Sequence, residues 1–576
     1  MTLHSGVEAP QRFLSSSFHA QPRPRKGAVA VKSLPAFKRL VLFVCVAVVF
    51  GVAVAVLALQ QPSADGSAAR ADAAKEKEKE KDRSWPLFGG TVSRNLVNLV
   101  DTNVPTTWSV KKGAEKNIKW SVQLGSKAYG GPIIADGKIF VGTNNNVPRN
   151  KRDLDANNDP VDKGVLMCFS EATGAFLWQY VSDKLPAGRV NDWPDEGICS
   201  SPVVEGKRLY FVTNRCEVLC CTTEGLASGK NEGVTDEKYK SETDADVVWR
   251  LDMIKELGVF PHNLATCSPL IIGDILFVIT SNGVDENHKN IPSPDAPSFL
   301  AIDKKTGKVK WNDKSPGKDI MHGQWSNPAY AEPNGKPMII FPGGDGWVRG
   351  FDPEKGDLLW KFDCNPKSAK YVLGPAGTKN DFVCTPVVWE NKLYIGVGQD
   401  PEHKKGVGHF WCIDIGKNPK NKDKDLSPVN DNLDPKDPVN KDSGLVWHYG
   451  GDAPEGADRS YLFGRTMSTA AVHDGLVYAA EFDKTVHCFD AKTGEEYWRH
   501  NLKADTWSSP YWVDGKIYLG DESGKITIFK HGKKKEILDT VQMGRSGVTL
   551  VRATPVVANG VLYVMSEDPC KLYAIK

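Results

Sequence analysis

The sequence of 576 residues lacks an excess of charge of either sign, because 73 Lys and Arg face 71 Asp and Glu and leave a formal charge of +2. Proteins that bind nucleic acid through its phosphates normally carry a basic surface, so this balance argues against that class. The chain also lacks a glycine-rich phosphate loop, a nucleophile elbow, Cys-x-x-Cys pairs for zinc and the Cys-x-x-Cys-His sequence that attaches haem. No reaction class is therefore indicated by a short motif.

Long apolar runs are absent except for Leu40 to Leu59, which contains no charged residue. About 20 apolar residues are needed to cross the hydrocarbon core as a helix, so this run predicts a transmembrane anchor. The positive-inside rule then places residues 1–39 in the cytoplasm and the rest of the chain on the exported, periplasmic side. The basic residues before the run, against the single acidic Glu8, are Arg12, Arg23, Arg25, Lys26, Lys32, Lys38 and Arg39.

The alternative to an anchor is a cleaved signal peptide, with Val56 and Ala58 placed for the peptidase. Its apolar region is normally only about 7 to 15 residues long, which favours the anchor. Residues 60–84 are rich in Ala, Ser and Asp and end in alternating Lys and Glu; this polar composition predicts a disordered, charged linker. Residues 85–576 remain as the folded body, and this length calls for several domains or a repeated architecture.

One pattern recurs through the folded body: small residues and a proline, a short apolar strand, a tight turn and a second strand. The turns are Asp-Gly or Asn-Gly between strands of alternating polarity, which is a strong signal for a β-hairpin. The start at Ser468 has Ala470 where the other starts have the proline. The eight starts lie at Tyr129, Ser200, Cys267, Ser326, Cys384, Ser468, Ser508 and Ala553.

A second signature follows the third strand of several units, where Asp or Ser, a Thr-Gly or Lys-Gly pair and a Trp are separated by fixed intervals. The Asp or Ser side chain can accept backbone N–H groups of a turn, the glycine supplies a positive φ, and the tryptophan begins a fourth strand that covers the next unit. The signature predicts four-stranded blades with structural tryptophans. Its four copies run from Ser170 to Trp178, from Asp303 to Trp311, from Asp352 to Trp360 and from Asp490 to Trp498.

The last unit ends at Lys576 after only three strands, which leaves one strand missing. Asn117 to Leu124 carries the pattern of a fourth strand, with Trp120 at the expected position, and precedes the first start. We expect this segment to complete the last blade and close the ring, which removes an exposed sheet edge. The sequence therefore predicts an all-β fold, an eight-bladed β-propeller of four-stranded antiparallel blades, preceded by one transmembrane helix.

These turns resemble those of the pyrroloquinoline quinone (PQQ)-like propeller repeats over about residues 85–576. That family includes quinoprotein alcohol dehydrogenases and a non-enzymatic propeller of the outer-membrane β-barrel assembly machinery, so the resemblance implies the fold and leaves the chemistry open. The segments WPLFGG at Trp85, HGQWSNPAY at His322 and FPGGDGW at Phe341 resemble membrane-anchored PQQ-like propellers of planctomycete-type bacteria. This narrower resemblance implies export.

Twelve cysteines in an exported chain would ordinarily suggest disulfides. Cys220 and Cys221 are adjacent, like the cysteines whose disulfide lies beside the cofactor of quinoprotein dehydrogenases. They lie in a third strand, however, whereas the dehydrogenase pair lies in a loop before an inner strand. Cys216 is close by in the sequence, so a surface disulfide remains an alternative. Five others occupy positions where the remaining repeats have small residues, so packing accounts for them. These are Cys168, Cys267, Cys384, Cys412 and Cys488.

Loops before the innermost strands converge around the axis of a propeller, so their polar and aromatic residues are candidates for a ligand-binding funnel. They combine carboxylates, imidazoles, guanidiniums and stacking surfaces. The alternative is that they cap strand ends and terminate turns. The candidates are Trp193, Asp195, Glu196, His262, Asn263, His322, Gln324, Trp325, Asp381, Arg465, Trp507, Arg545 and Arg552.

A quinoprotein would need a calcium ion held by acidic and amide oxygens, an Asp base and a flat aromatic under the quinone. The funnel has residues of these types, but not in the order of the dehydrogenase pattern, so PQQ and calcium stay open as cofactors. Elsewhere, oxygen donors alternate as in a calcium loop, without the usual glycine or the twelfth-position Glu, which leaves a solvated loop as the alternative. These donors are Asp153, Asp155, Asn157 and Asp159.

Two functions follow from the sequence. The favoured one is a binding or assembly scaffold on the outer side of the cytoplasmic membrane, whose funnel or rim binds a protein, peptide or glycan. The alternative is a PQQ- and calcium-dependent oxidoreductase that acts on alcohols or sugars. The scaffold is favoured because no catalytic residue is indicated.

Overall fold

The computed structural model describes residues 83–374, 376–399 and 406–576. The described residues all belong to one compact unit, Glu80–Lys576. The predicted cytoplasmic tail and anchor, and nearly all of the predicted linker, lie outside them. Within the described part of the chain, no helix is both long enough and apolar enough to cross a bilayer.

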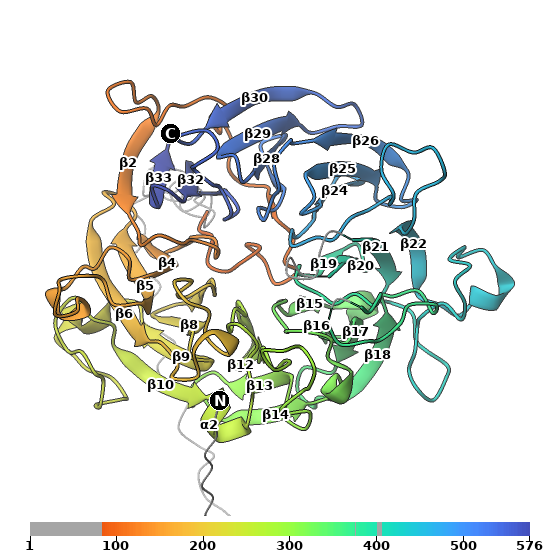
Figure 1. Cartoon of the computed structure of the whole chain (residues 1–576), viewed down its shortest axis with the longest axis horizontal. Helices are drawn as coiled ribbons and strands as arrows, with labels where there is room; N and C mark the ends of the chain where they lie inside the picture. The colour runs from red at the N-terminus through yellow and green to blue at the C-terminus, as the bar shows by residue number, and fades with distance from the viewer. Residues whose placement is uncertain (1–82, 375, 400–405) are drawn as a thin grey trace, which may run out of the picture. The chain divides into compact units, whose positions relative to one another are not determined.

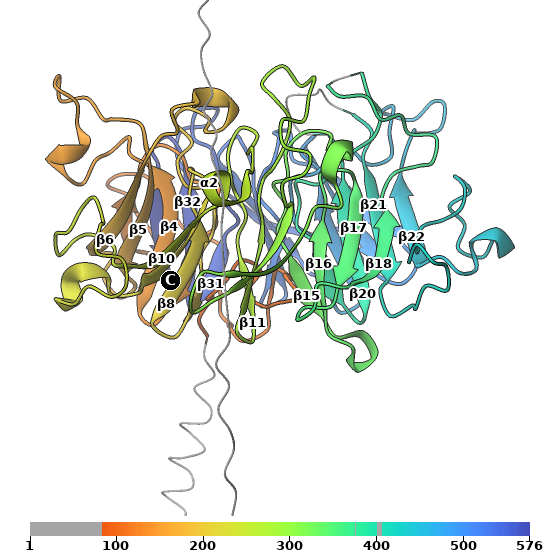
Figure 2. The same ribbon diagram turned by 90° about the horizontal axis from the view of Figure 1, so that it is seen from below.

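Eight sheets are arranged in a ring, seen along its axis in Figure 1 and edge-on in Figure 2. Their pairings are antiparallel, except that the short β1 (Val97–Asn98) adds in parallel to one of them. In each of the first seven blades, four consecutive strands pair in order from the axis to the rim, and the eighth blade combines three C-terminal strands with one from the N-terminal region. This arrangement confirms the eight-bladed propeller predicted from the repeats. The only α-helix in the described residues is α2 (Met253–Leu257).

The strands of the first four blades are as follows. Blade 1 contains β3 (Ile133–Ala135), β4 (Lys138–Asn144), β5 (Lys163–Ser170) and β6 (Phe176–Asp183); blade 2 contains β7 (Val203–Glu205), β8 (Arg208–Val212), β9 (Glu217–Thr222) and β10 (Val247–Asp252). Blade 3 contains β11 (Leu270–Ile272), β12 (Ile275–Ile279), β13 (Phe299–Asp303) and β14 (Val309–Asp313); blade 4 contains β15 (Ala329–Ala331), β16 (Met338–Pro342), β17 (Trp347–Phe351) and β18 (Leu358–Asp363).

The remaining blades follow the same order. Blade 5 contains β19 (Val387–Trp389), β20 (Lys392–Val397), β21 (His409–Asp414) and β22 (Leu445–Gly450); blade 6 contains β23 (Ala471–His473), β24 (Leu476–Ala480), β25 (Thr485–Asp490) and β26 (Glu496–Asn501). Blade 7 contains β27 (Tyr511–Val513), β28 (Lys516–Gly520), β29 (Lys525–Lys530) and β30 (Ile537–Gln542), with the short β1 (Val97–Asn98) added; blade 8 contains β31 (Val556–Ala558), β32 (Val561–Ser566), β33 (Lys571–Ile575) and β2 (Ile118–Gln123).

In six of the eight blades, a tryptophan near the start of the outer strand donates its indole N–H to a carbonyl of the next blade. Trp249 of blade 2 donates its indole N–H to the carbonyl of Lys304 in blade 3, at 2.9 Å. A Cβ atom on Gly307 would lie 2.7 Å from the Trp249 ring, and Gly307 has a φ of +73°, so both the contact and the turn require glycine. Of the four tryptophans predicted to be structural, Trp178, Trp311 and Trp498 form this bond, to Thr223, Pro353 and Gly532. The fourth, Trp360, donates instead to the sulfur of Met338 in its own blade.

The ring closes through the N-terminal strand, as the sequence predicted. Strand β2 pairs with β33 so that Trp120 lies opposite Ala574, and Figure 1 shows the C-terminus beside β2. The Trp120 indole then donates to the carbonyl of Glu171 in blade 1, at 3.2 Å. Blade 8 is therefore held from both ends of the propeller chain.

A segment before β2 crosses one end of the axis, which the sequence did not predict. We call residues 83–101 the plug; Figure 1 shows it crossing the centre of the ring in orange. Its hydrogen bonds reach the innermost strand, or the residues next to it, in every blade. The partners in blades 1 to 8 are Ile134, Val204, Ser268 with Pro269, Tyr330, Val388, Val472, Trp512, and Val557 with Asn559.

Arg94 is the centre of the plug and is completely buried. Its guanidinium donates four hydrogen bonds of 2.8 to 3.0 Å to backbone carbonyls in three parts of the chain. Burial lowers the pKa of Arg94 to about 10, so the side chain remains charged at neutral pH. The accepting carbonyls belong to Phe88, Ser268, Pro269 and Pro328.

The cysteines of the described residues are all free, and all but the half-buried Cys199 are buried. Packing therefore accounts for them, as the repeat register indicated. Cys216, for which a disulfide was left open, places its thiol 3.2 Å from the carbonyl of Thr280 in the next blade. Cys220 and Cys221 are adjacent in β9 and are not bonded to each other.

Candidate functional site

The principal cavity lies on the propeller axis and is closed at one end by the plug. It has a volume of about 320 Å³, and the plug contributes Phe88 to its lining. Short residues next to the innermost strands, such as Gly130, Ser201, Thr385 and Ser509, form much of the wall. We call this space the axial cavity, and its size lies at the lower end of the range for ligand sites.

Aromatic side chains from the loops before the innermost strands surround the axial cavity. Trp193, Trp325 and Trp507 all line it. The rings of Trp507 and Tyr129 meet edge to face, with centroids 5.6 Å apart. Leu264, Val383 and Met467 add further apolar surface, so the cavity suits an apolar or aromatic group.

Among the described residues of the cavity wall, the one guanidinium, that of Arg552, is already neutralised. Arg552 donates through Nε to Glu522 at 2.7 Å and through Nη1 to Glu567 at 3.1 Å and to the Tyr129 hydroxyl at 2.9 Å. Burial opposes the charge of Arg552, but Tyr129 and the two carboxylates outweigh it and raise its pKa. Burial also raises the pKa of Tyr129, which stays protonated. Arg552 therefore serves mainly to hold Tyr129 in place.

The single carboxylate of the described cavity wall belongs to Glu196. It lies 3.9 Å from the ammonium of Lys127. Burial raises the pKa of Glu196, and Lys127 offsets only part of that effect. Together with the neutralised Arg552, this leaves the axial cavity with little net charge.

The structure places about half of the predicted funnel residues on the cavity wall. Gln324 instead joins blades by donating to Asn282 and Ser298 at 2.9 Å, and the guanidinium of Arg465 lies over the Phe482 ring. Asp195 and Arg545 are exposed, Asp381 is buried in a backbone bridge to Gly398, and His262 and His322 lie beside Trp325. Those on the wall are Trp193, Glu196, Asn263, Trp325, Trp507 and Arg552.

Sequence reasoning missed several wall residues. Tyr129 had been identified only as the start of the first repeat, although its ring borders the cavity. Phe88 comes from the plug, which has no repeat pattern. Met467 precedes the one start that lacks a proline, and its position in the register was a usable signal.

In the loop with the alternating oxygen donors, residues 153–159, the first carboxylate forms an ion pair. Asp153 is completely buried and lies 2.9 Å from the ammonium of Lys163. Asp155 accepts the backbone N–H groups of Asn157 and Asp159, as in an ordinary turn. Calcium binding by this loop stays a prediction, and it would require the buried ion pair to open.

A buried ionic cluster lies within blade 6. His487 has no exposed side-chain surface, and its ring nitrogens lie 2.7 Å from Glu481 Oε1 and 2.5 Å from Glu496 Oε1. Because carboxylates only accept hydrogen bonds, both ring nitrogens donate and the imidazole is protonated. Arg459 donates a further pair of hydrogen bonds to Glu481, at 2.7 and 2.8 Å.

This cluster predicts a pH dependence of stability. Burial opposes the charge of His487, but Glu481 and Glu496 outweigh it and raise its pKa above 6.5. The pKa of Glu481 is lowered, because His487 and Arg459 outweigh its burial. The contribution of His487 to the free energy of unfolding is complete below pH 6.5 and is lost as the pH rises through its raised pKa. The contribution of Glu481 is lost only as the pH falls through its lowered pKa.

We therefore expect the melting temperature of the wild type to fall more steeply between about pH 6 and pH 9 than that of the variant His487→Gln. At pH 6 the substitution is expected to cost about 1.5 to 3 kcal/mol, because the buried Glu481 loses one charge-assisted hydrogen bond and keeps only those from Arg459. Differential scanning fluorimetry across the pH range measures both effects. Parallel profiles for the two proteins would contradict the assignment.

The chain resembles a known protein family in sequence and a solved structure in fold. The sequence matches the family described as outer membrane protein assembly factor BamB over residues 162–437 and 439–576. No curated protein matches it. Among solved structures, the quinohemoprotein alcohol dehydrogenase ADHIIG of Pseudomonas putida HK5 has a TM-score of 0.52 at 12% identity, over 88% of this chain and 81% of that chain.

Two further structures are similar at lower TM-scores. BamB from Moraxella catarrhalis gives 0.44 at 14% identity, over 79% of this chain and 98% of that chain. A europium-containing methanol dehydrogenase gives 0.42 at 11% identity, over 86% and 91%. The ADHIIG structure shares the fold of this chain, and at 12% identity that likeness does not by itself assign a reaction.

Proposed function

Because the chain belongs to the family of the outer membrane protein assembly factor BamB, we propose that it is a binding scaffold whose axial cavity captures an apolar segment of a partner protein. The observation that carries this proposal is the axial cavity itself, a blind space of about 320 Å³ with the plug at one end and tryptophans around it. Such a space holds a few side chains rather than a folded domain.

The wall chemistry favours a peptide over a glycan. A glycan presents many hydroxyl groups, and each one buried without a hydrogen-bond partner costs free energy. The described wall offers only two charged side chains, and Arg552 is already bonded to Glu522 and Glu567. Neutral polar groups of the wall also bond within the protein, as Ser201 does to Gly131 and Asn327 does to Thr385. Apolar side chains of a peptide would instead gain from burial against Trp193, Trp325 and Trp507.

The residues present do not fit the cofactor of the alternative function. PQQ carries three carboxylates, and calcium in quinoproteins needs several oxygen ligands. Among the described wall residues, the one cation is Arg552 and the one carboxylate is Glu196. Asp195 is exposed and Asp381 lies off the wall. These positions leave PQQ without cationic partners and calcium without a ligand set.

The proposal includes attachment to the outer side of the cytoplasmic membrane through Leu40 to Leu59, in keeping with the resemblance to membrane-anchored propellers of planctomycete-type bacteria. Support comes from the charge-free run and the basic residues before it. Retention of the full-length chain in membranes after an alkaline wash is the measurement that tests this attachment.

A cross-linking experiment tests the binding function. A photoreactive phenylalanine analogue replaces Trp507 in the axial cavity, and in a second protein it replaces Val429, which is 62% exposed. We expect a specific cross-linked partner only from position 507. Filling the cavity with Val383→Trp should lower its yield about tenfold or more, the equivalent of about 1.4 kcal/mol.

The matched control is Val439→Trp, which adds the same indole at an exposed position outside the cavity. It is expected to leave the cross-link unchanged. Equal yields from Val383→Trp and the wild type would rule out capture in the axial cavity. Turnover of alcohols or sugars after reconstitution with PQQ and calcium, lost in Val383→Trp, would instead support the oxidoreductase.

A further inference from the structure

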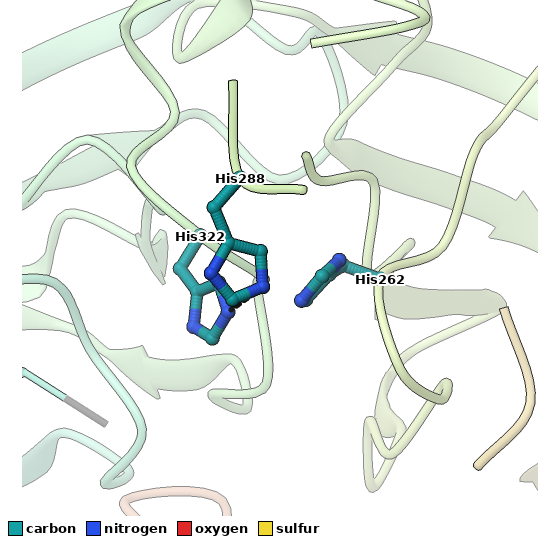
Figure 3. A group of neighbouring side chains, drawn as sticks. All are labelled: His262, His288 and His322. Carbon is teal, nitrogen blue, oxygen red and sulfur yellow. Dashed lines mark hydrogen bonds between the residues drawn. The ribbon is translucent and has the colours of Figure 1, made fainter. Parts of the chain in front are cut away.

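Three histidines from three different loops meet beside the axial cavity. His262 lies between α2 and β11, His288 between β12 and β13, and His322 between β14 and β15. One ring nitrogen from each lies within 4.8 Å of the other two. Figure 3 shows the ring of His262 pointing toward the other two rings. His262 and His322 are each only 1% exposed.

The spacing of the ring nitrogens matches a metal site. The Nε2 atoms of His288 and His322 lie 3.3 Å apart. Two nitrogens bound to one tetrahedral zinc ion at about 2.0 to 2.1 Å are separated by about 3.3 Å. His262 completes the group after a movement of at most about 1.5 Å, because its nitrogen already lies within 4.8 Å of the other two and about 3.3 Å is needed.

The backbone orients His262 for this role. Its Nδ1 lies 2.9 Å from the carbonyl oxygen of Val284. Because a carbonyl only accepts, Nδ1 must carry the proton, and the lone pair of the neutral ring then lies on Nε2. A histidine that binds metal through one nitrogen commonly donates through the other to a carbonyl in this way.

Backbone contacts also fix the three loops to one another. Val284 donates its N–H to the carbonyl of His322 at 3.0 Å, and His262 donates to Ser281 at 3.1 Å. A Cβ atom on Gly283 would lie 2.5 Å from the His322 carbonyl and 2.6 Å from the His262 Cβ. The loops can approach this closely only with glycine there, so the three rings are held together before any ligand binds.

We propose that His262, His288 and His322 bind a divalent late-transition-metal ion such as zinc. Imidazole nitrogen suits zinc, copper, nickel and iron, whereas calcium and magnesium require oxygen ligands. Three histidines leave a fourth coordination position open. That position is available to water or an anionic group.

A second cavity, of about 220 Å³, adjoins the three histidines. It is lined by Arg189, Asn263 and Glu286 as well as His262 and His288. Asn263 also lines the axial cavity, and the guanidinium of Arg189 lies 4.0 Å over the Trp193 ring. The metal site therefore borders the axial cavity, and the three histidines that define it are the same whatever binds in that cavity.

Zinc titration of the full-length protein tests the site. The protein is purified in detergent without a polyhistidine tag, stripped with a chelator and titrated with Zn²⁺ by calorimetry. We expect one ion per chain, and a loss of affinity of roughly 100-fold or more in His322→Gln. Co²⁺ in place of zinc should give the intense visible absorption of tetrahedral coordination.

Two further variants distinguish loss of zinc binding from misfolding and from the loss of any histidine. His288 is only half-buried, so His288→Gln is expected to fold and to lose binding even where His322→Gln does not fold. His473→Gln changes a half-buried histidine in blade 6 and should bind zinc like the wild type. Wild-type affinity in His288→Gln, less than one ion per chain in the wild type, or only octahedral cobalt would each overturn the proposal.

Discussion

The variant Arg94→Leu is expected to melt about 4 °C or more below the wild type. Leucine would leave four buried carbonyls without the donor that now bonds them, at about 1 kcal/mol or more each. With an unfolding entropy of about 2.1 cal/mol/K per residue, roughly 490 ordered residues lose about 1 °C for each kcal/mol. Differential scanning calorimetry of the full-length protein in detergent measures the change.

Two control variants separate the effect of the guanidinium hydrogen bonds from the effects of charge and of the substitution itself. Arg545→Leu makes the same substitution at an exposed position and is expected to change stability by less than about 0.5 kcal/mol. Arg94→Lys keeps the charge but offers three donors without the planar fork, so it should recover only part of the loss. A melting point for Arg94→Leu within about 1 °C of the wild type would refute a central role for the plug.

Removal of residues 571–576 is expected to abolish folding. Strand β33 pairs with both β32 and β2, and Leu572, Ala574 and Ile575 within it are completely buried. Each large apolar side chain contributes about 1.5 to 3 kcal/mol, whereas proteins are stable by only about 5 to 15 kcal/mol. The shortened chain would also leave β2 and β32 as open edges that invite aggregation.

The control for this truncation removes Lys576 alone. That residue lies outside β33 and contributes one backbone hydrogen bond, to Asn117, so a near-native melting curve is expected. Size-exclusion chromatography and circular dichroism distinguish a folded monomer from aggregate. A soluble, folded chain ending at Cys570 would show that closure by β2 and β33 is dispensable.

The repeats predicted the propeller because each carries the same local chemistry. Asp303 accepts the N–H groups of Lys305 and Thr306 in the turn, and Gly307 makes room for Trp249. Such contacts lie within one turn or between neighbouring copies, so they recur at fixed spacing in the sequence. Trp120 could be recognised as a displaced member of the same series.

The plug could not be predicted in this way. Its one strand, β1, has only two residues, and most of its hydrogen bonds go to single residues in different blades. These partners are not regularly spaced, so no periodic pattern in the segment indicates them. The WPLFGG sequence at Trp85 and the charged Arg94 mark the segment, but neither specifies its path. The role of Arg94 depends on carbonyls from residues 88 to 328.

The funnel candidates were predicted in part, because the sequence identifies a loop but not the direction of each side chain. Glu196 faces the axial cavity while its neighbour Asp195, which has a φ of +63°, is exposed. His262 and His322 were identified, but their grouping depends on His288. That residue comes from an insertion between β12 and β13, whose path no repeat register specifies.

The plug also has a consequence for biosynthesis. Asn98 bonds Val557, a separation of 459 residues, and Asn117 bonds the final residue, Lys576. Contacts so distant along the chain make folding slow, because the entropy of closing the loop is lost before they form. The plug and β2 therefore stay without their partners until blade 8 has been synthesised, and their exposed backbone groups are most prone to aggregation during that interval.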